Sequence, residues 1–99
     1  MTAHGRFITL EGGEGAGKST QIRLLAEALC AEGRQVVTTR EPGGSAGAEE
    51  IRSLLVNGSV GRWLPVSEAM LLSAARHDHV QRTILPALGA GHWGLCDRF

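Results

Sequence analysis

At residues 12–19 the sequence reads Gly12-Gly13-Glu14-Gly15-Ala16-Gly17-Lys18-Ser19, which fills every fixed position of the pattern G-x-x-x-x-G-K-[S/T]. Glycines let a backbone turn closely enough for several N–H groups to point at one phosphate chain, and a following helix adds the partial positive charge of its N-terminus. Lys18 supplies a mobile charge for the β- and γ-phosphates, and the Ser19 hydroxyl supplies a ligand for Mg²⁺. These residues therefore predict a site for a magnesium-bound nucleoside triphosphate.

The residues on either side have the order that such a loop requires. Phe7-Ile8-Thr9-Leu10 is a short β-prone run suited to a buried parallel strand. After the loop, apolar residues recur at helical spacing up to the stop at Gly33, and they form one stripe: Ile22, Leu25, Ala26 and Leu29. The alternative, a glycine-rich turn without a ligand, leaves this order of strand, loop and helix unexplained.

Length and composition restrict the class of protein. The 99 residues suffice for one small domain, and the ten basic and ten acidic residues balance without a run of either sign. This balance argues against a nucleic-acid groove or a site for an anionic membrane surface. No apolar stretch approaches the roughly 20 residues that span a bilayer, and residues 1–6 lack the apolar core of a secretory signal. We expect a cytoplasmic protein with small-molecule ligands.

Cysteine and histidine positions do not favour a metal centre. Cys30 and Cys96 lie far apart in apolar segments, without a Cys or His partner at metal-ligand spacing, so both are expected to be reduced packing residues. In His77-Asp78-His79 the two imidazoles are two positions apart and would point away from each other on a helix. This triplet is expected to be solvated helix surface.

A second strand is predicted at residues 35–39, directly before Arg40-Glu41-Pro42-Gly43-Gly44. Ligands of parallel α/β sheets bind beyond the carboxyl ends of the strands, so Arg40 and Glu41 should lie beside the phosphate loop. Arg40 is then placed to bind a second phosphate. The alternative is a surface Arg-Glu pair before an ordinary Pro-Gly turn, and the sequence leaves the isomer of Pro42 open.

Two further helices are predicted after this turn. A short packing helix covers residues 48–57, and a loop over residues 58–65 contains Trp63 as an anchor. Ser67 is expected to cap the next helix, whose residues 69–75 are apolar almost all round and therefore predict burial.

Leu72 and Arg76 stand one helical turn apart on this helix. Together they would present an apolar surface and a guanidinium, which suits the base and the phosphate of a nucleotide. Taken alone, the two residues fit a core leucine and a solvated arginine better.

The chain then turns back toward the sheet. Pro86 should bend or restart the helix, because it lacks an N–H and clashes with the carbonyl of Arg82. Residues 92–96 predict a third strand, which delivers Asp97 and Arg98 to the sheet edge that holds the phosphate loop. The aspartate can hold a Mg²⁺-bound water or orient a basic residue, and the arginine can bind phosphoryl oxygens.

Three blocks together resemble the thymidylate kinases of the nucleoside monophosphate kinase group. They are residues 11–20, the Arg-Glu-Pro-Gly-Gly block at 40–44, and Asp97-Arg98-Phe99, and the resemblance covers the whole chain. It implies a three-layer α/β/α fold of the P-loop NTPase type, with a parallel sheet in which the third strand lies between the first and second. Residues 1–99 would form the N-terminal part of a single kinase domain, incomplete at the C-terminus, inactive alone and with the first strand as an open edge.

The activity that this resemblance implies is transfer of the γ-phosphoryl group of ATP to thymidine monophosphate, with Mg²⁺. By position, the catalytic residues would be Lys18, Arg40 and Arg98, and Ser19 and Asp97 would serve the metal. The ATP-binding residues would be Gly12, Gly13, Glu14, Gly15, Ala16, Gly17, Lys18, Ser19 and Thr20. The acceptor would be bound by Glu14, Arg40, Leu72, Arg76 and Arg98.

Three positions characterise this chain within the resemblance. Leu72 stands where the family commonly has a phenylalanine that stacks on thymine, and Phe99 stands where tyrosine or histidine is frequent. Gly15 resembles the bacterial type, which forms homodimers and supplies catalytic arginines from a later lid. Another small-molecule P-loop kinase and a noncatalytic nucleotide-binding module remain the alternative functions.

Overall fold

The computed structural model describes residues 5–13, 15 and 17–99. Its strands form one parallel sheet, and they coincide with the three predicted runs to within one residue: β1 (Phe7–Leu10), β2 (Val36–Arg40) and β3 (Trp93–Asp97). The strand order is β1-β3-β2, with Leu95 of β3 paired with Ile8 on one side and Thr38 on the other. The expected central position of the third strand is confirmed, and β1 lies at an edge.

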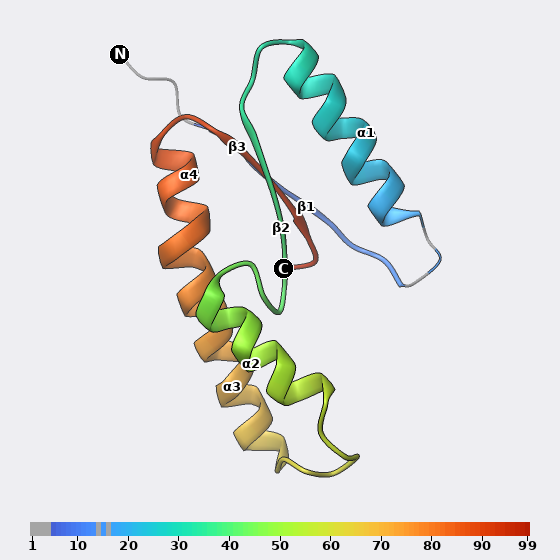
Figure 1. Ribbon diagram of the computed structural model, residues 1–99, viewed down its shortest axis with the longest axis vertical. Coiled ribbons are helices and arrows are strands. Elements are labelled where there is room, and N and C mark those ends of the chain that lie inside the picture. The colour runs from blue at the N-terminus through green and yellow to red at the C-terminus, as the bar shows by residue number, and fades with distance from the viewer. Residues whose placement is uncertain (1–4, 14, 16) are drawn as a thin grey trace.

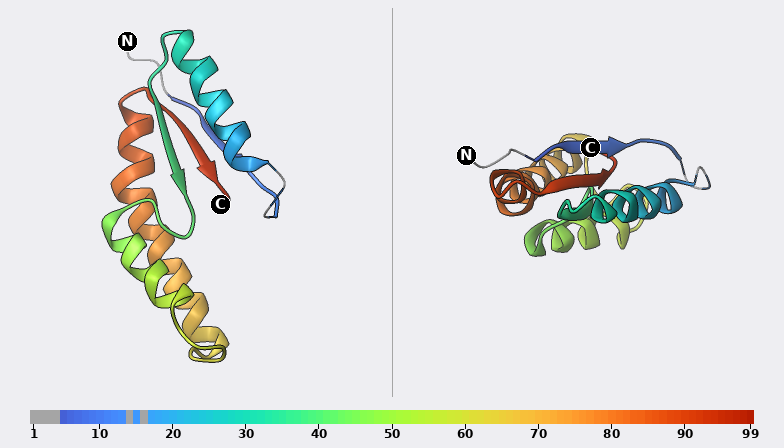
Figure 2. Two further views of the ribbon diagram at one scale, coloured as in Figure 1. Left: turned by 45° about the vertical axis from the view of Figure 1, so that its right-hand side comes forward. Right: turned by 90° about the horizontal axis from the view of Figure 1, so that it is seen from above.

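Helices cover both faces of this sheet (Figures 1 and 2). After β1 the chain crosses over the position of β3 to form β2 on the far side. It then returns to form β3 between the other two strands. Because crossovers between parallel strands are right-handed, these opposite steps put their connecting helices on opposite faces. Helix α1 (Lys18–Ala31) packs on β2 and β3 from one side, and α4 (Leu85–Gly89) meets β3 from the other. The three-layer α/β/α arrangement is thereby confirmed.

The core is centred on the middle strand. Leu95 and Cys96 of β3 are completely buried, as expected for a parallel strand with helices on both faces. Both cysteines, which lie in the described part of the chain, are free. The expectation that both pack internally is correct for Cys96 and wrong for Cys30, which is exposed in an open hollow between α1 and the edge strand β2.

Helix α2 (Ala46–Val56) begins two residues before the predicted start. Its N-cap is Ser45, whose hydroxyl accepts a hydrogen bond from the Ala48 N–H at 3.3 Å. Trp63 anchors the loop after α2, as predicted, since its indole N–H donates to the Leu54 carbonyl at 3.4 Å. Local capping and anchoring thus set both ends of this segment.

Helix α3 (Pro65–His79) corrects two predictions. It begins at Pro65, which suits a first turn because it has no N–H to lose, so Ser67 lies inside the helix and is not its cap. Burial of the apolar stretch is also wrong for most of its length: Met70 and Leu72 are exposed, and within residues 69–75 Ala75 is the residue that is buried. Helices α2 and α3 pack on each other and extend past the end of the sheet, so no layer covers their outer sides in the described residues (Figure 1).

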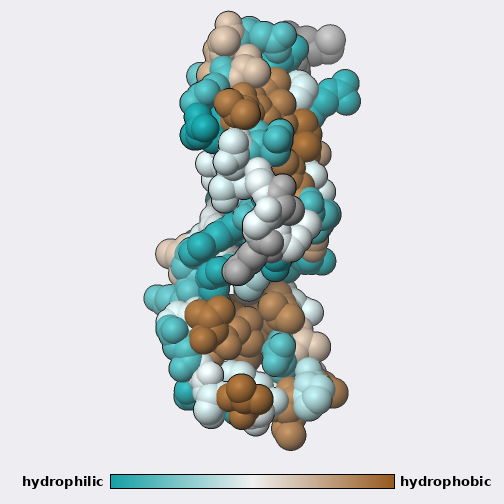
Figure 3. All heavy atoms as spheres, turned by 90° about the vertical axis from the view of Figure 1, so that its right-hand side faces the viewer, coloured by the Kyte–Doolittle hydropathy of each residue, from teal (hydrophilic) through white to brown (hydrophobic). Residues whose placement is uncertain are grey.

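Exposed apolar side chains gather at this end of the molecule, over α2 and α3 (Figure 3). They include Leu54, Val56, Val60, Leu64, Val66 and Met70. None of the helices in residues 5–13, 15 and 17–99 is both long and apolar enough to cross a membrane.

Helix α3 continues into η1 (Val80–Ile84), a π-helical turn, and then into α4. The Leu85 N–H bonds to the Val80 carbonyl, five residues earlier. This wider turn accommodates Pro86, which cannot bond to the Arg82 carbonyl, and regular α-helix restarts at Leu85, as predicted. The rod formed by α3, η1 and α4 is therefore continuous but changes its periodicity just before the proline.

Candidate functional site

Lys18 begins α1 at the end of the glycine-rich loop. Gly17 precedes it with φ of 83°, a left-handed conformation that side chains disfavour, and this turn directs the chain into the helix. The Lys18 Nζ lies 2.6 Å from the Asp97 Oδ1 at the end of β3, and the two side chains are 12% and 33% exposed. Asp97 therefore orients the lysine from the end of β3. The predicted contacts of Glu14 and Ala16 lie outside the described residues.

A cavity of about 460 Å³ opens where the loop meets the carboxyl ends of β2 and β3. Its lining includes Gly13, Gly15, Gly17, Lys18, Ser19, Thr20, Arg40, Asp97 and Arg98. Strand order alone places these residues together, because the carboxyl ends of parallel strands meet at one edge. We call this cavity the loop cavity.

Arg40 reaches the loop cavity from the end of β2 and is held there by Glu49 of α2. Its Nη2 lies 2.6 Å from the Glu49 Oε1, and both side chains are about half-exposed, at 50% and 41%. The hydrogen bond between them raises the pKa of Arg40 and lowers the pKa of Glu49. Exposed pairs of this kind contribute at most about 1 kcal/mol, so a phosphate can replace Glu49 at little cost.

Arg98 follows Asp97 in a left-handed conformation, with φ of 69°. For a residue with a Cβ this costs about 1 kcal/mol, and three contacts hold it. The Arg98 N–H donates to the Leu10 carbonyl at 3.0 Å, its guanidinium donates to the Gly12 carbonyl at 3.3 Å, and the Cys96 thiol donates to the Arg98 carbonyl at 2.8 Å. Burial raises the pKa of Cys96 to about 12, so its thiol keeps the proton that it donates.

A second cavity of about 200 Å³ adjoins the first, since Glu41 and Arg98 line both. The rest of its lining comes from the turn after β2, from α3 and from the residue after Arg98: Pro42, Leu72, Ser73, Arg76 and Phe99. The Phe99 ring carries the Arg76 guanidinium 4.3 Å from its centroid and meets the Phe7 ring edge-on at 5.3 Å. Leu72 and Arg76 thus line one small site, as the spacing on their helix predicted. We call it the acceptor cavity, after the role predicted for these residues.

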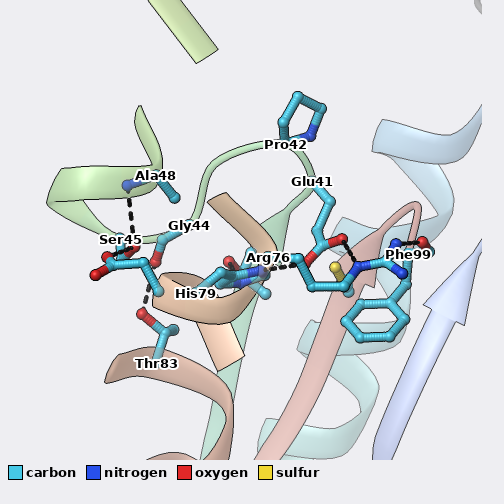
Figure 4. A network of polar contacts seen from close by, with 12 residues as sticks. Glu41, Pro42, Gly44, Ser45, Ala48, Arg76, His79, Thr83 and Phe99 are labelled. Atoms are coloured by element: carbon cyan, nitrogen blue, oxygen red, sulfur yellow. Dashed lines mark hydrogen bonds and ion pairs between the residues drawn. The ribbon is translucent and has the colours of Figure 1, made fainter. Parts of the chain in front are cut away.

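Glu41 joins Arg76, in the wall of the acceptor cavity, to the buried His79 (Figure 4). Its carboxylate accepts from the Arg76 Nε at 2.9 Å and lies 2.9 Å from the His79 Nδ1. The His79 Nε2 lies 2.6 Å from the Thr39 hydroxyl, and the imidazole is completely buried. The expectation that residues 77–79 are solvated surface is therefore wrong for His79, because that side of the helix faces β2.

Sequence reasoning missed the residues that hold the turn after β2. The Glu41–Pro42 peptide bond is cis, the Arg52 guanidinium donates to the Pro42 carbonyl at 2.9 Å, and the Thr83 hydroxyl donates to the Gly44 carbonyl at 2.7 Å. Among these residues, only the burial of His79 had a sign in the sequence. His79 stands four positions after Ala75, so the two share one helical face, and Ala75 is buried. The partners of Arg52 and Thr83 depend on how α2 and η1 approach the turn.

Gly44 makes room for this arrangement, and its replacement by alanine is expected to destabilise the protein. Its φ is 92°, and an added Cβ would overlap the His79 imidazole and the Thr39 hydroxyl. The left-handed strain and the overlap together should lower the free energy of unfolding by about 2 to 4 kcal/mol. Urea denaturation measures this change.

Gly89→Ala is the matched control for Gly44→Ala. Within the described residues, a Cβ at Gly89 meets no atom within 4 Å, and Gly89 lies in α4. The free energy of unfolding should stay the same or rise by up to about 1 kcal/mol. Equal losses in the two variants would contradict the role assigned to Gly44.

Comparisons with known proteins agree with this geometry. The family model described as Thymidylate kinase matches residues 10–99. Proteins named thymidylate kinase from Rhizorhabdus wittichii and Caulobacter vibrioides are 65% and 63% identical to the chain over 95 residues, which is 96% of this chain and 46% of each relative. The solved thymidylate kinase from Ehrlichia chaffeensis matches with a TM-score of 0.85 and 40% identity, over 97% of this chain and 55% of that one.

The chain thus spans about half the length of the curated relatives it matches. Within that half, the sequence match extends from the end of β1 through the glycine-rich loop to Phe99, and the structural match covers nearly every residue. The chain belongs to the thymidylate kinase family.

Proposed function

We propose that the protein transfers the γ-phosphoryl group of ATP to thymidine monophosphate and so forms thymidine diphosphate. One observation carries this proposal: the loop cavity and the acceptor cavity adjoin, and Arg98 and Glu41 line both. Two phosphate-bearing ligands in these cavities would meet end to end, as an in-line transfer requires. The names of the relatives supply the acceptor.

In this proposal the side chains act by position and charge. Lys18, oriented by Asp97, would bind the β- and γ-phosphates in the loop cavity. Arg40, Arg76 and Arg98 would bind the phosphate of the acceptor, and Glu14 would lie near its sugar. Since two polyanions repel, such arginine forks hold them in line and stabilise the charge that spreads over the transferred group.

The donor atoms available to Mg²⁺ fit its preference for oxygen. The Ser19 hydroxyl and the Asp97 carboxylate belong to residues that line the loop cavity, and both are hard oxygen ligands. We infer that these two residues hold the metal, Asp97 directly or through a water molecule. When bound, Mg²⁺ neutralises part of the charge on the phosphates during transfer.

Leu72 favours a second candidate, a P-loop kinase of the same kind with another acceptor. Its side chain is partly exposed and lines the acceptor cavity, where it offers an apolar contact without an aromatic face. Such a contact selects weakly among bases. A nucleotide-dependent switch or noncatalytic module would instead bind nucleotide without forming product.

A panel of acceptors tests these functions in the protein at its full encoded length. With ATP and Mg²⁺, thymidine monophosphate should be phosphorylated with a kcat/KM at least about tenfold above those of uridine and cytidine monophosphates. Equal turnover of all three would favour the broader kinase. Saturable ATP binding without product from any acceptor would favour the noncatalytic module.

The proposal extends to the oligomeric state of the enzyme and to its place in the cell. We infer a homodimer, which fits the exposed apolar side chains of α2 and α3, among them Leu64, Val66 and Met70. We also infer a cytoplasmic enzyme that acts on small molecules. Its balanced charge fits an enzyme that binds neither nucleic acid nor an anionic membrane.

A further inference from the structure

Two residues follow the end of β3 and lie beside the segment that leads from β1 into the glycine-rich loop. The Arg98 N–H donates to the Leu10 carbonyl at 3.0 Å, and the next N–H, that of Phe99, donates to the Glu11 Oε1 at 3.2 Å. The left-handed turn at Arg98, with φ of 69°, brings both N–H groups to the side of β1. A side-chain carboxylate therefore continues the pairing of β1 and β3 beyond its last main-chain hydrogen bond.

Phe99 lines the acceptor cavity without being buried. It is 43% exposed, and its ring meets the Phe7 ring edge-on, with 5.3 Å between the centroids. On the cavity side the ring supports the Arg76 guanidinium, 4.3 Å from its centroid (Figure 4). Close packing on all sides fixes a core side chain, whereas a ring that is partly in solvent also depends on how its main chain is held.

Phe7 and Glu11 hold Phe99 from one strand and its extension. They are four positions apart, and even spacing puts the side chains of an extended chain on the same face. Phe7 contacts the ring of Phe99, while the Glu11 carboxylate accepts from its main chain. Gly94 pairs with Phe7 across the sheet and leaves room for its ring, because an added Cβ would lie 3.2 Å from it. The end of β1 therefore supports this wall of the acceptor cavity.

Glu11 can affect the acceptor cavity only through such a contact. It is exposed and is not among the described residues that line either cavity. A hydrogen bond from an N–H to an ionised carboxylate is stronger than one to a neutral oxygen. The next residue, Gly12, accepts from the Arg98 guanidinium at 3.3 Å. Residues 10–12 thus hold the main chain and the side chain that follow Asp97.

We propose that Glu11 is a positioning residue of the acceptor site: by accepting the Phe99 N–H it fixes the ring that forms a wall of the acceptor cavity. This inference rests on the proposed function, which puts the nucleoside monophosphate in that cavity. Glu11 itself does not touch the reacting groups. Because it directly precedes Gly12, one short segment holds both the glycine-rich loop and the wall of the acceptor cavity.

Two substitutions of Glu11 separate its hydrogen bond from its charge. A glutamine keeps an acceptor oxygen at the same distance from the main chain, whereas an alanine removes it. In the protein at its full encoded length, Glu11→Ala should raise the KM for thymidine monophosphate about tenfold, and Glu11→Gln about threefold or less. Since both variants lose the charge, their difference reports the hydrogen bond. The KM for ATP should stay within about twofold in both.

A double-mutant cycle with Phe99→Ala tests whether Glu11 acts through the ring. Phe99→Ala keeps the N–H that Glu11 accepts and removes the ring, so Glu11→Ala should then change the acceptor KM by less than about twofold. Equal effects of Glu11→Ala with and without the ring would overturn the proposal. So would equal acceptor KM values in Glu11→Gln and Glu11→Ala, or equal rises of both nucleotide KM values.

Glu32→Ala is the matched control. Glu32 follows α1, is 69% exposed and lies 4.0 Å from Arg34, so its loss should leave both KM values within about twofold of the wild type. An acceptor KM raised as much as in Glu11→Ala would contradict a specific role of Glu11. The wild-type protein is assayed first: failure to phosphorylate any nucleoside monophosphate refutes the proposed function and the inference that rests on it, whereas a normal acceptor KM in Glu11→Ala refutes the positioning role alone.

Discussion

Lys18→Ala is expected to lower kcat/KM for phosphoryl transfer at least about a hundredfold and to weaken ATP binding more than acceptor binding. The lysine is the positive charge that begins α1 in the loop cavity, and Asp97 holds its ammonium at 2.6 Å. Removing it leaves the transferred group without that charge when the transition state forms. Initial rates over a grid of both nucleotide concentrations measure the two effects.

Arg23→Ala is the matched control for Lys18→Ala. Arg23 lies on the same helix, is exposed, and pairs with Glu27 at 3.2 Å away from the loop cavity. An exposed i,i+4 pair contributes only about 0.5 kcal/mol, so turnover and stability should hardly change. A comparable loss of activity in both variants would show that helix stability, not the charge at Lys18, limits the reaction.

Arg40→Ala is expected to raise the KM for thymidine monophosphate about ten- to a hundredfold while the KM for ATP changes by less than about threefold. Arg40 lines the loop cavity at the end of β2, next to Glu41, which lines both cavities, and an exposed pair with Glu49 restrains it. Its loss removes a charged fork from the acceptor phosphate and leaves the phosphate loop intact. Equal losses for both nucleotides would reject this assignment.

Glu49→Gln supplies the complementary variant. It removes the carboxylate with which the acceptor phosphate would compete for Arg40, at 2.6 Å in this structure. The acceptor KM should therefore fall slightly or stay unchanged, within about threefold of the wild type. A rise as large as that of Arg40→Ala would mean that Glu49 orients the arginine for binding and does not compete with the phosphate.

Much of the loop cavity could be predicted because its parts are contiguous in sequence or end a strand. Residues 12–19 encode their own backbone turn through glycine, and Lys18 and Ser19 follow within the same stretch. Arg40 and Asp97 each come at the end of a β-prone run, and parallel strands bring such ends to one edge. None of these inferences needs the packing of helices.

Predictions failed where a residue's environment depends on the arrangement of helices. An apolar helix predicts burial, but α3 extends past the sheet and exposes Met70. A His-Asp-His triplet on a helix predicts solvation, but His79 faces β2. In both cases the helix itself was predicted correctly. The pattern could not show which side of the helix faces the sheet and which side faces solvent.

The α/β fold and the position of Lys18 at the edge of the sheet could be predicted from residues 12–19, the three β-prone runs and the charges that end two of them, because short-range geometry specifies each of them. The link from His79 through Glu41 to Arg76 arose only when α3 packed against the end of β2. Hydrogen bonds between residues 38 and 40 positions apart have no local pattern, since they exist only once tertiary packing has excluded water from the groups they join.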